Sequence, residues 1–301
     1  MAQRTLGLTN RTRCTGPREA KAGADNVIAS GRRTRDIGDM IRVAAVSLAL
    51  ALPYAAQAQE RAPVQLNFAV YAAGLNVLEI QSGIDLHDSG YRVDVSYHTV
   101  GVFGLVFHSE IHSVVQGEWL GPGLMPQRFS SWGTLRGSQR QTLIDYVKGQ
   151  PIVRTLEPLV DTERDPVPVA LQRDTIDTLS AMVLMVRQVA ATGRCDGHAS
   201  TFDGRRLAEI VSHTVGDEVL GNDGRSSFSG VALRCDIEGR QLGGFQHDAD
   251  AEELHKIQHS TAWLARLVPG GPKLPVRVLF ETRFFGHGTA YLTETVLGPV
   301  Q

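Results

Sequence analysis

Apolar and polar residues alternate with a period of two through most of the chain beyond residue 63. Between Tyr91 and His98, the odd positions are aromatic or aliphatic and the even positions are polar. This alternation is typical of a half-buried antiparallel strand, because successive side chains point to opposite faces of a sheet. The pattern predicts strands at 64–72, 75–84, 91–100, 107–115, 129–135, 139–147, 152–156, 200–202, 205–214, 227–238, 275–285 and 289–297.

The period changes to that of a helix over residues 175–192. Apolar residues recur there at spacings of three and four, which places them on one face of a helix. Asp174 or Asp177 can cap its N-terminus, and Gly193 stands where a C-terminal glycine is favoured. A second helix is predicted over residues 251–267.

Together these elements predict a mainly β fold of the α+β class. Strands joined by short turns favour a long curved antiparallel sheet, shaped as a half-barrel or roll, with the helices on its concave face. The Gly/Pro-rich segment 117–126 and the acidic segment 159–168 are expected to be loops. Residues 59–301 are numerous enough to form a single β-rich domain.

Residues 40–58 have the pattern of a cleavable secretory signal peptide. A short positively charged start at Arg42 precedes an apolar run that a proline interrupts. Residues 56–58, Ala-Gln-Ala, fit the motif that signal peptidase accepts, which predicts a cut between Ala58 and Gln59. A retained membrane anchor is the alternative, but a spanning helix needs roughly 20 apolar residues and this run is shorter. We therefore expect a periplasmic protein that is not integral to the membrane after cleavage.

Residues 1–39 contain eight basic residues and show no hydrophobic periodicity. Such a segment cannot bury a core, so it is expected to be disordered. The simplest hypothesis is that translation starts at Met40 and that the preceding residues are a misannotated extension.

The net charge becomes more negative when the predicted signal peptide and the residues before it, 1–58, are excluded. The chain has 30 basic and 32 acidic residues, and nine of the basic and four of the acidic residues precede residue 59. Residues 59–301 therefore hold 21 basic and 28 acidic residues, a net charge of −7. An acidic balance argues against non-specific binding to nucleic acid or to anionic membranes.

Three cysteines are present: Cys14, Cys195 and Cys235. Cys14 leaves with the leader, so an even pair remains in a chain that is bound for an oxidising compartment. We predict a disulfide between Cys195 and Cys235. Two unpaired buried thiols are the alternative.

One predicted strand carries a candidate metal set, His108, Glu110 and His112. These side chains share a face of the strand, and their types bind zinc. Each step between them is roughly 7 Å, which is long for one ion, so a solvated polar face is the alternative. His255 and His259 stand four apart in the second predicted helix, where they form another candidate pair or simply part of a solvated face.

The sequence contains no catalytic constellation that we can recognise. It lacks the G-x-S-x-G and S-x-x-K patterns of serine nucleophiles. No glycine-rich loop joins a strand to a helix, so we expect neither a nucleotide nor another cofactor.

A tight turn at Asp203-Gly204 is followed by Arg205 and Arg206. Two adjacent guanidinium groups can bind a carboxylate or phosphate headgroup bidentately. They can equally pair with acidic residues of the same domain and anchor the turn. The sequence thus offers one possible ligand anchor whose alternative is structural.

Several short sequence motifs occur in a particular order along the chain. They are Tyr71-Ala72 with Gly74-Leu75, Tyr91, Thr99-Val100-Gly101, Gly123-Leu124-Met125-Pro126 before Phe129, Ile176 to Ala181, Phe202 to Arg206 after Cys195, Phe228 before Gly230, Cys235, and Leu274-Pro275-Val276-Arg277. In this order the sequence resembles DUF3108, an exported proteobacterial family of unknown function, over residues 64–297. A tyrosine is usual in that family where this chain has Phe228. The resemblance implies a periplasmic, β-rich protein and no catalytic residue.

Three functions are compatible with these features. The first is a non-enzymatic carrier that holds an apolar, lipid-like envelope ligand between the curved sheet and the helix that starts near Thr175. The second is a cell-envelope scaffold that binds another protein. The third is a metal-dependent hydrolase that uses His108, Glu110 and His112.

Overall fold

The computed structural model describes residues 63–248, 256–282 and 286–298. The segments predicted as an N-terminal extension, 1–39, and as a signal peptide, 40–58, lie outside these residues. Within the described residues, the chain forms one 13-stranded sheet. The predicted mainly β fold with a long antiparallel sheet is therefore confirmed.

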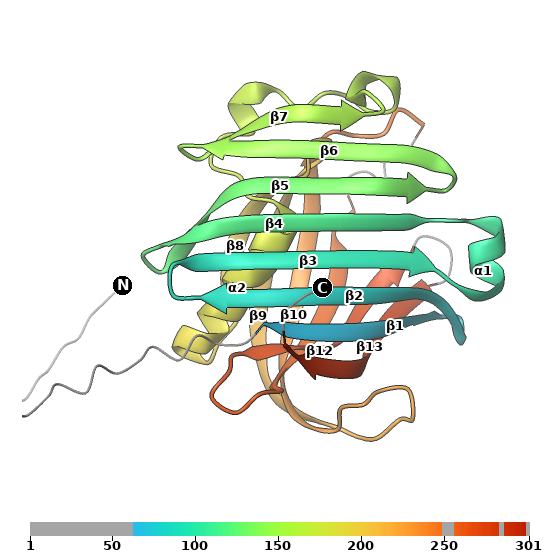
Figure 1. Cartoon of the computed structure of the whole chain (residues 1–301), viewed down its shortest axis with the longest axis vertical. Helices are drawn as coiled ribbons and strands as arrows, with labels where there is room; N and C mark the ends of the chain where they lie inside the picture. Colours follow the sequence, from blue (N-terminus) through green and yellow to red (C-terminus); the bar gives the residue numbers. More distant parts are fainter. Residues whose placement is uncertain (1–62, 249–255, 283–285, 299–301) are drawn as a thin grey trace, which may run out of the picture. The chain divides into compact units, whose positions relative to one another are not determined.

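The sheet consists of two meanders that are joined by the first and last strands. Its order is β7-β6-β5-β4-β3-β2-β1-β13-β12-β11-β10-β9-β8, so β1 pairs with β13 from Val64 opposite Leu297 to Ala72 opposite Gly288 (Figure 1). The strands are β1 (Val64–Ala72), β2 (Leu75–His87), β3 (Gly90–Thr99), β4 (Glu110–Leu120), β5 (Gly123–Leu135), β6 (Ser138–Val147), β7 (Gln150–Glu157), β8 (Gly197–Phe202), β9 (Leu207–Leu220), β10 (Gly230–Gly243), β11 (Gln258–Arg266), β12 (Lys273–Thr282) and β13 (Gly286–Leu297).

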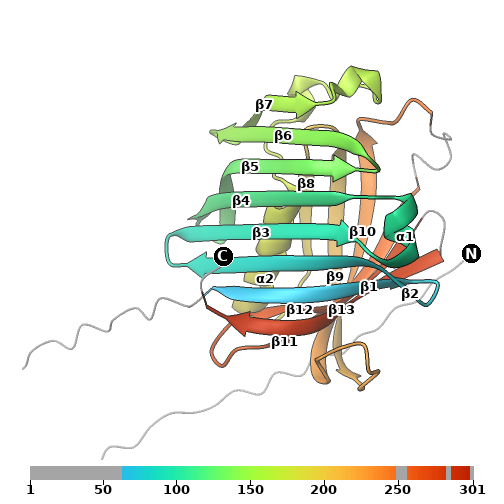
Figure 2. The ribbon, with the colours of Figure 1, turned by 45° about the vertical axis from the view of Figure 1, so that its right-hand side comes forward.

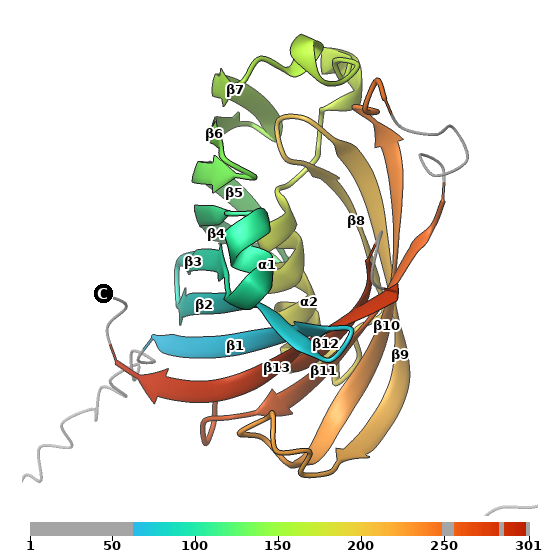
Figure 3. The same cartoon turned by 90° about the vertical axis from the view of Figure 1, so that its right-hand side faces the viewer.

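The sheet curves so that its two meanders face each other across a helix, α2 (Thr178–Thr192) (Figure 3). Strands β1 to β7 run side by side on one side of this helix (Figure 2). Val183, Val186 and Val189 on α2 are buried in the same core cluster as residues from both meanders. The helix therefore packs directly against the concave side of the sheet.

Local sequence explains where α2 begins and ends. The Asp177 side chain accepts a hydrogen bond from the backbone N–H of Ser180 at 2.9 Å, as an N-cap residue should. Gly193 ends the helix in the left-handed region at φ 74°, which glycine adopts without steric cost. The helix predicted over 175–192 is thus confirmed, with Asp177 rather than Asp174 as its cap.

Three shorter helical segments complete the described chain. They are α1 (Gly101–Val106), η1 (Val160–Thr162) and η2 (Val169–Leu171). Among the described residues, no helix has the length and apolar character needed to cross a bilayer.

The helix predicted over 251–267 was wrong, because Gln258–Arg266 is strand β11, paired with β10 and β12. The five consecutive residues 261–265 are all buried. A strand in the middle of a sheet can be covered on both faces, whereas a surface helix buries only one stripe of side chains. Such a continuously buried run has neither period, so the sequence does not separate the two structures.

The loop predicted over 117–126 was also largely wrong, because β4 and β5 continue to a turn at Gly121-Pro122. Gly117 lies inside β4 for a packing reason. A Cβ atom at this position would stand 2.7 Å from the ring of Tyr91 on β3. Glycine at position 117 therefore indicates close contact with the Tyr91 side chain and not a loop.

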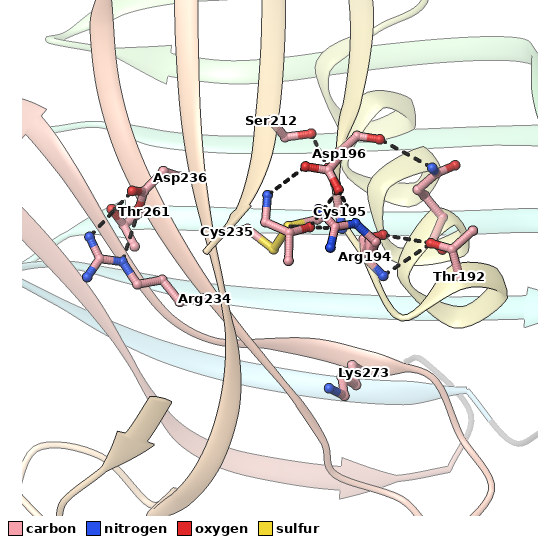
Figure 4. The surroundings of a disulfide bond; sticks show 12 residues. Thr192, Arg194, Cys195, Asp196, Ser212, Arg234, Cys235, Asp236, Thr261 and Lys273 are labelled. Carbon is pink, nitrogen blue, oxygen red and sulfur yellow. Dashed lines mark hydrogen bonds and ion pairs between the residues drawn. A yellow bond between two sulfur atoms is a disulfide. The ribbon is translucent and has the colours of Figure 1, made fainter. Parts of the chain in front are cut away.

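Cys195 and Cys235 form a disulfide, as predicted, with both residues fully buried (Figure 4). The bond ties the segment after α2 to strand β10. Asp196 supports the same segment, since its carboxylate accepts hydrogen bonds from the backbone N–H and the hydroxyl of Thr214 at 3.0 Å each. The hydrogen bond from the Thr214 N–H is the main cause that lowers the pKa of Asp196 to about 2.

Candidate functional site

The turn that carries Arg205 and Arg206 connects β8 to β9. Asp203 Oδ1 accepts hydrogen bonds from the backbone N–H groups of Arg205 at 2.9 Å and Arg206 at 2.7 Å. Gly204 has φ +90°, and a Cβ atom there would lie 2.9 Å from Cγ2 of Thr142 on β6. The turn is therefore held against the opposite meander, with its arginines near β6.

Two further arginines join this turn from distant parts of the chain. The resulting arginine cluster consists of Arg140 on β6, Arg164 after η1, Arg205 and Arg206, together with the carboxylates Glu163 and Asp203. The cluster thus has four guanidinium groups and two carboxylates, and Arg164 donates to the carbonyl of Gly244 at 3.0 Å, which leaves a formal excess of positive charge in an acidic domain.

Ion pairs fix most members of the arginine cluster. Arg140 binds Glu163 through two parallel hydrogen bonds, at 2.5 Å and 2.7 Å. Arg206 pairs with Asp203 at 2.8 Å. Arg205 donates from Nη2 to the carbonyl of Glu157 at 2.7 Å, whereas its Nη1 is 3.8 Å from Glu163 Oε2. These contacts orient the guanidinium planes but leave hydrogen-bond capacity unused.

The electrostatics reflect crowding of like charges. Burial, and then the charge of Arg140, lower the pKa of Arg205. Burial, and then the charge of Arg206, lower the pKa of Arg164. The hydrogen bond from Arg140 lowers the pKa of Glu163, which keeps this carboxylate ionised. An additional anion would relieve the repulsion between the arginines.

Two buried donors in the arginine cluster have no hydrogen-bond partner, Nε of Arg140 and Nη1 of Arg205. A buried donor without a partner costs roughly 1–3 kcal/mol, and more when it is charged. An additional acceptor that entered between the guanidinium groups would satisfy both atoms. The arginine cluster therefore has the charge and the unpaired donors that attract a carboxylate or a phosphate, and the anion has to reach them from the surface of the cluster.

A surface depression of about 640 Å³ adjoins the arginine cluster. It includes Glu157, the residue whose carbonyl binds Arg205. Its apolar lining comes from Leu156, Pro158 and Leu159, and Leu159 is 65% exposed. A volume of this size is in the range that holds small-molecule ligands.

A family model described as "Protein of unknown function (DUF3108)" matches residues 67–293. The chain belongs to this family. No curated protein matches it significantly. Among solved structures it is similar to a "Beta-barrel-like Protein of Domain of Unknown Function DUF1849" from Brucella abortus, with 10% sequence identity, a TM-score of 0.48, and coverage of 80% of this chain and 100% of that one.

In this DUF3108 protein, the three residues of the candidate metal set, His108, Glu110 and His112, are not brought together. Glu110 and His112 form an exposed pair at 3.4 Å, and the His112 ring stacks on Trp132 with centroids 5.8 Å apart. His108 precedes the strand and is exposed. Among the described residues, no three His, Cys, Asp or Glu side chains are grouped so that they could hold a metal ion.

The second histidine pair, His255 and His259, does not share a helix as predicted, because His259 is part of a strand. His259 lies on strand β11, where its Nδ1 is 3.8 Å from Oε1 of Glu238. His255 lies outside the described residues.

Sequence reasoning found Arg205 and Arg206 but missed Arg140 and Arg164. Residue 140 lies in the predicted strand 139–147 and residue 164 lies in the segment expected to be a loop, and an isolated arginine carries no signal in either place. One clue was available, because Arg164 is a basic residue in an otherwise acidic segment, 159–168. The pairing of that segment with β6 depends on the tertiary fold.

Proposed function

We propose that this DUF3108 protein is an exported, non-enzymatic binding protein of the cell envelope that holds a lipid-like anion. The headgroup of the ligand binds the arginine cluster, and its apolar chain lies on Leu156, Pro158 and Leu159. The observation that carries the proposal is the pair of buried donors without partners, on Arg140 and Arg205. The signal peptide expected at 40–58 and the disulfide are in keeping with an extracytoplasmic location.

A phosphate or carboxylate headgroup suits this site for geometric reasons. The planar guanidinium group presents parallel N–H donors that match two oxygens of such an anion. The proposed position differs from the one expected between the sheet and the Thr175 helix, because α2 packs directly on the core there. The ligand instead lies at the edge of the sheet, next to β7.

Isothermal titration of the full chain with dodecyl phosphate tests the proposal, with inorganic phosphate as the probe for the headgroup alone. We expect Arg205→Gln to weaken binding of dodecyl phosphate at least tenfold, since a hydrogen bond to a charged group contributes about 1.5–3 kcal/mol. Leu159→Ser should weaken binding of dodecyl phosphate but leave binding of inorganic phosphate unchanged.

The matched control is Arg194→Gln. Arg194 forms an exposed ion pair with Asp196 at 2.7 Å just before β8, at the end of that strand opposite the β8–β9 turn. This variant should bind dodecyl phosphate like the unmodified protein. The proposal fails if dodecyl phosphate does not bind, or if Arg205→Gln and Arg194→Gln bind it equally well.

One observation favours a second function, a scaffold that contacts a partner in the envelope. The short helix α1 has no buried residue, and Val102, Leu105 and Val106 are 66%, 87% and 71% exposed. Contiguous exposed apolar side chains often mark interaction sites. If α1 is such a site, a crosslink to an envelope protein from position 105 should be lost in Val106→Ser but persist in Val219→Ser, which alters another exposed valine (74%).

A further inference from the structure

A groove lies on the outer face of the first meander, remote from α2. On β3, the Tyr91 hydroxyl is 2.7 Å from Oγ of Ser180 on α2, so Tyr91 points to the concave side. Asp94 and Ser96 have the opposite parity and therefore point outward. The groove has a volume of about 470 Å³, and its outward lining includes Gln65, Gln81, Asp94, Ser96, His112 and Trp132.

Strand register places these side chains in two adjacent rows across β1 to β5. One row runs from Gln81 on β2 through Ser96 and His112 to Trp132 on β5. The other row runs from Gln65 on β1 through Gly83 on β2 to Asp94 on β3. The groove is thus a feature of the sheet face itself, and its width is set by the spacing of neighbouring strands.

The backbone of these strands cannot recognise a ligand in the groove. Strands β1 to β5 each pair with a neighbour on both sides, so their N–H and C=O groups are already used within the sheet. An additional peptide strand therefore has no edge to join here. Recognition must come from side chains.

The side chains offer free hydrogen-bonding groups without a positive charge. The amides of Gln65 and Gln81 have no hydrogen-bond partner among the described residues, and each has both donors and an acceptor. Asp94 accepts from Arg92 at 2.9 Å and 3.0 Å and retains lone pairs. No lysine or arginine is part of the groove lining, and Arg92 beside it is already paired with Asp94, which disfavours phosphate and other anions.

An aromatic surface lies at the end of the groove. Trp132 is 44% exposed, and its ring stacks on His112 at an interplanar angle of 17°. An exposed tryptophan offers a large, rigid apolar face. Beside neutral amides and a carboxylate, such a face matches a ligand with hydroxyl groups at its rim and C–H groups on its faces.

We propose that this groove binds a neutral saccharide. The saccharide is a short chain: one pyranose ring would pack its C–H face on Trp132 on β5, and the hydroxyl groups of the following sugars would bond to Asp94, Gln81 and Gln65 on β3, β2 and β1. The site is independent of the arginine cluster, since it lies on the outer face of other strands and takes an uncharged ligand. Failure of either proposal therefore leaves the other untouched.

Isothermal titration of the full chain with chitotriose, cellotriose, N-acetylglucosamine and glucose tests this assignment. We expect at least one of the two trisaccharides to bind, and expect Trp132→Ala and Gln81→Ala each to weaken its binding at least fivefold. Gln116→Ala is the control, because Gln116 is exposed on the same face of β4 but does not line the groove; it should bind like the unmodified protein. Circular dichroism checks that the variants are folded.

The panel also tests the length of the ligand. Trp132 and Gln81 stand three strand spacings apart, roughly 14 Å, which one sugar ring cannot span, so a trisaccharide should bind at least tenfold more tightly than its monosaccharide. The proposal is overturned if neither trisaccharide binds, if a monosaccharide binds as tightly as its trisaccharide, or if either Trp132→Ala or Gln81→Ala binds like the unmodified protein.

Discussion

Replacing Asp177 by Asn should remove a specific part of the pH dependence of stability. Asp177 is fully buried at the start of α2. Its Oδ2 accepts a hydrogen bond from the Ser180 hydroxyl at 2.6 Å, and that hydroxyl also contacts the Tyr91 hydroxyl. Burial raises the pKa of Asp177 to about 6, although the hydrogen bonds from Ser180 oppose this shift. Asn is nearly isosteric and caps helices about as well as Asp.

The sign and size of the effect follow from proton linkage. Because the pKa in the folded state is above the unfolded value of 3.8, the folded protein binds the proton more tightly. The free energy of unfolding therefore rises as the pH falls through 6, and the contribution is complete below the unfolded pKa. Integration between a folded pKa of about 6 and an unfolded pKa of 3.8 gives about 1.3 kcal/mol between pH 7 and pH 5.

Urea unfolding at pH 7 and pH 5, with the disulfide intact, measures this contribution. On going from pH 7 to pH 5, the free energy of unfolding of the unmodified protein should increase by about 1.3 kcal/mol relative to that of Asp177→Asn. Carboxylates with lowered pKa values, such as Glu163 and Asp145, act in the opposite direction, but they cancel because both proteins contain them. Equal pH dependence in the two proteins would refute the raised pKa of Asp177.

Two further predictions concern covalent and backbone constraints. Replacing both Cys195 and Cys235 by Ala should lower the free energy of unfolding by about 4 kcal/mol, since the bond closes a loop with a sequence separation of 40; a loss below about 1 kcal/mol in urea unfolding would contradict this. Gly244→Ala should cost more than about 3 kcal/mol, because its Cβ would lie only 1.8 Å from the carbonyl oxygen of Arg205. Gly137→Ala is the control: φ is similar, +80°, but nothing lies within 4 Å, so thermal unfolding should show a loss of about 1 kcal/mol.

Much of the fold could be predicted because its elements have strong local signals. The alternation in 91–98 is visible without any partner strand, and the caps Asp177 and Gly193 are side-chain and backbone preferences that act within one turn. The loop predicted at 117–126 and the helix predicted at 251–267 were wrong because tertiary packing decides which structure these residues adopt. Gly117 appeared to break a strand, yet it makes room for the ring of Tyr91, and 261–265 are buried on both faces of a strand.

The candidate sites divide in the same way. Arg205 and Arg206 are adjacent in sequence, and His108, Glu110 and His112 follow one another on what was predicted to be one strand. Arg140 and Arg164 come to the arginine cluster only through the packing of β6 and the segment after η1 against the β8–β9 turn. The groove on the outer face likewise requires the register of five strands, which no single segment specifies.

The sequence alone determined a β-rich domain with one capped helix and a buried cysteine pair, because short-range periodicity, turn residues and composition carry that information. Only the tertiary structure decided that the first and last strands close the two meanders into one sheet. It also decided that four arginines gather around two carboxylates and that Trp132 stands in a row with Gln81. These features depend on contacts between residues far apart in the chain, and such contacts form only when the whole sheet has curved around its core.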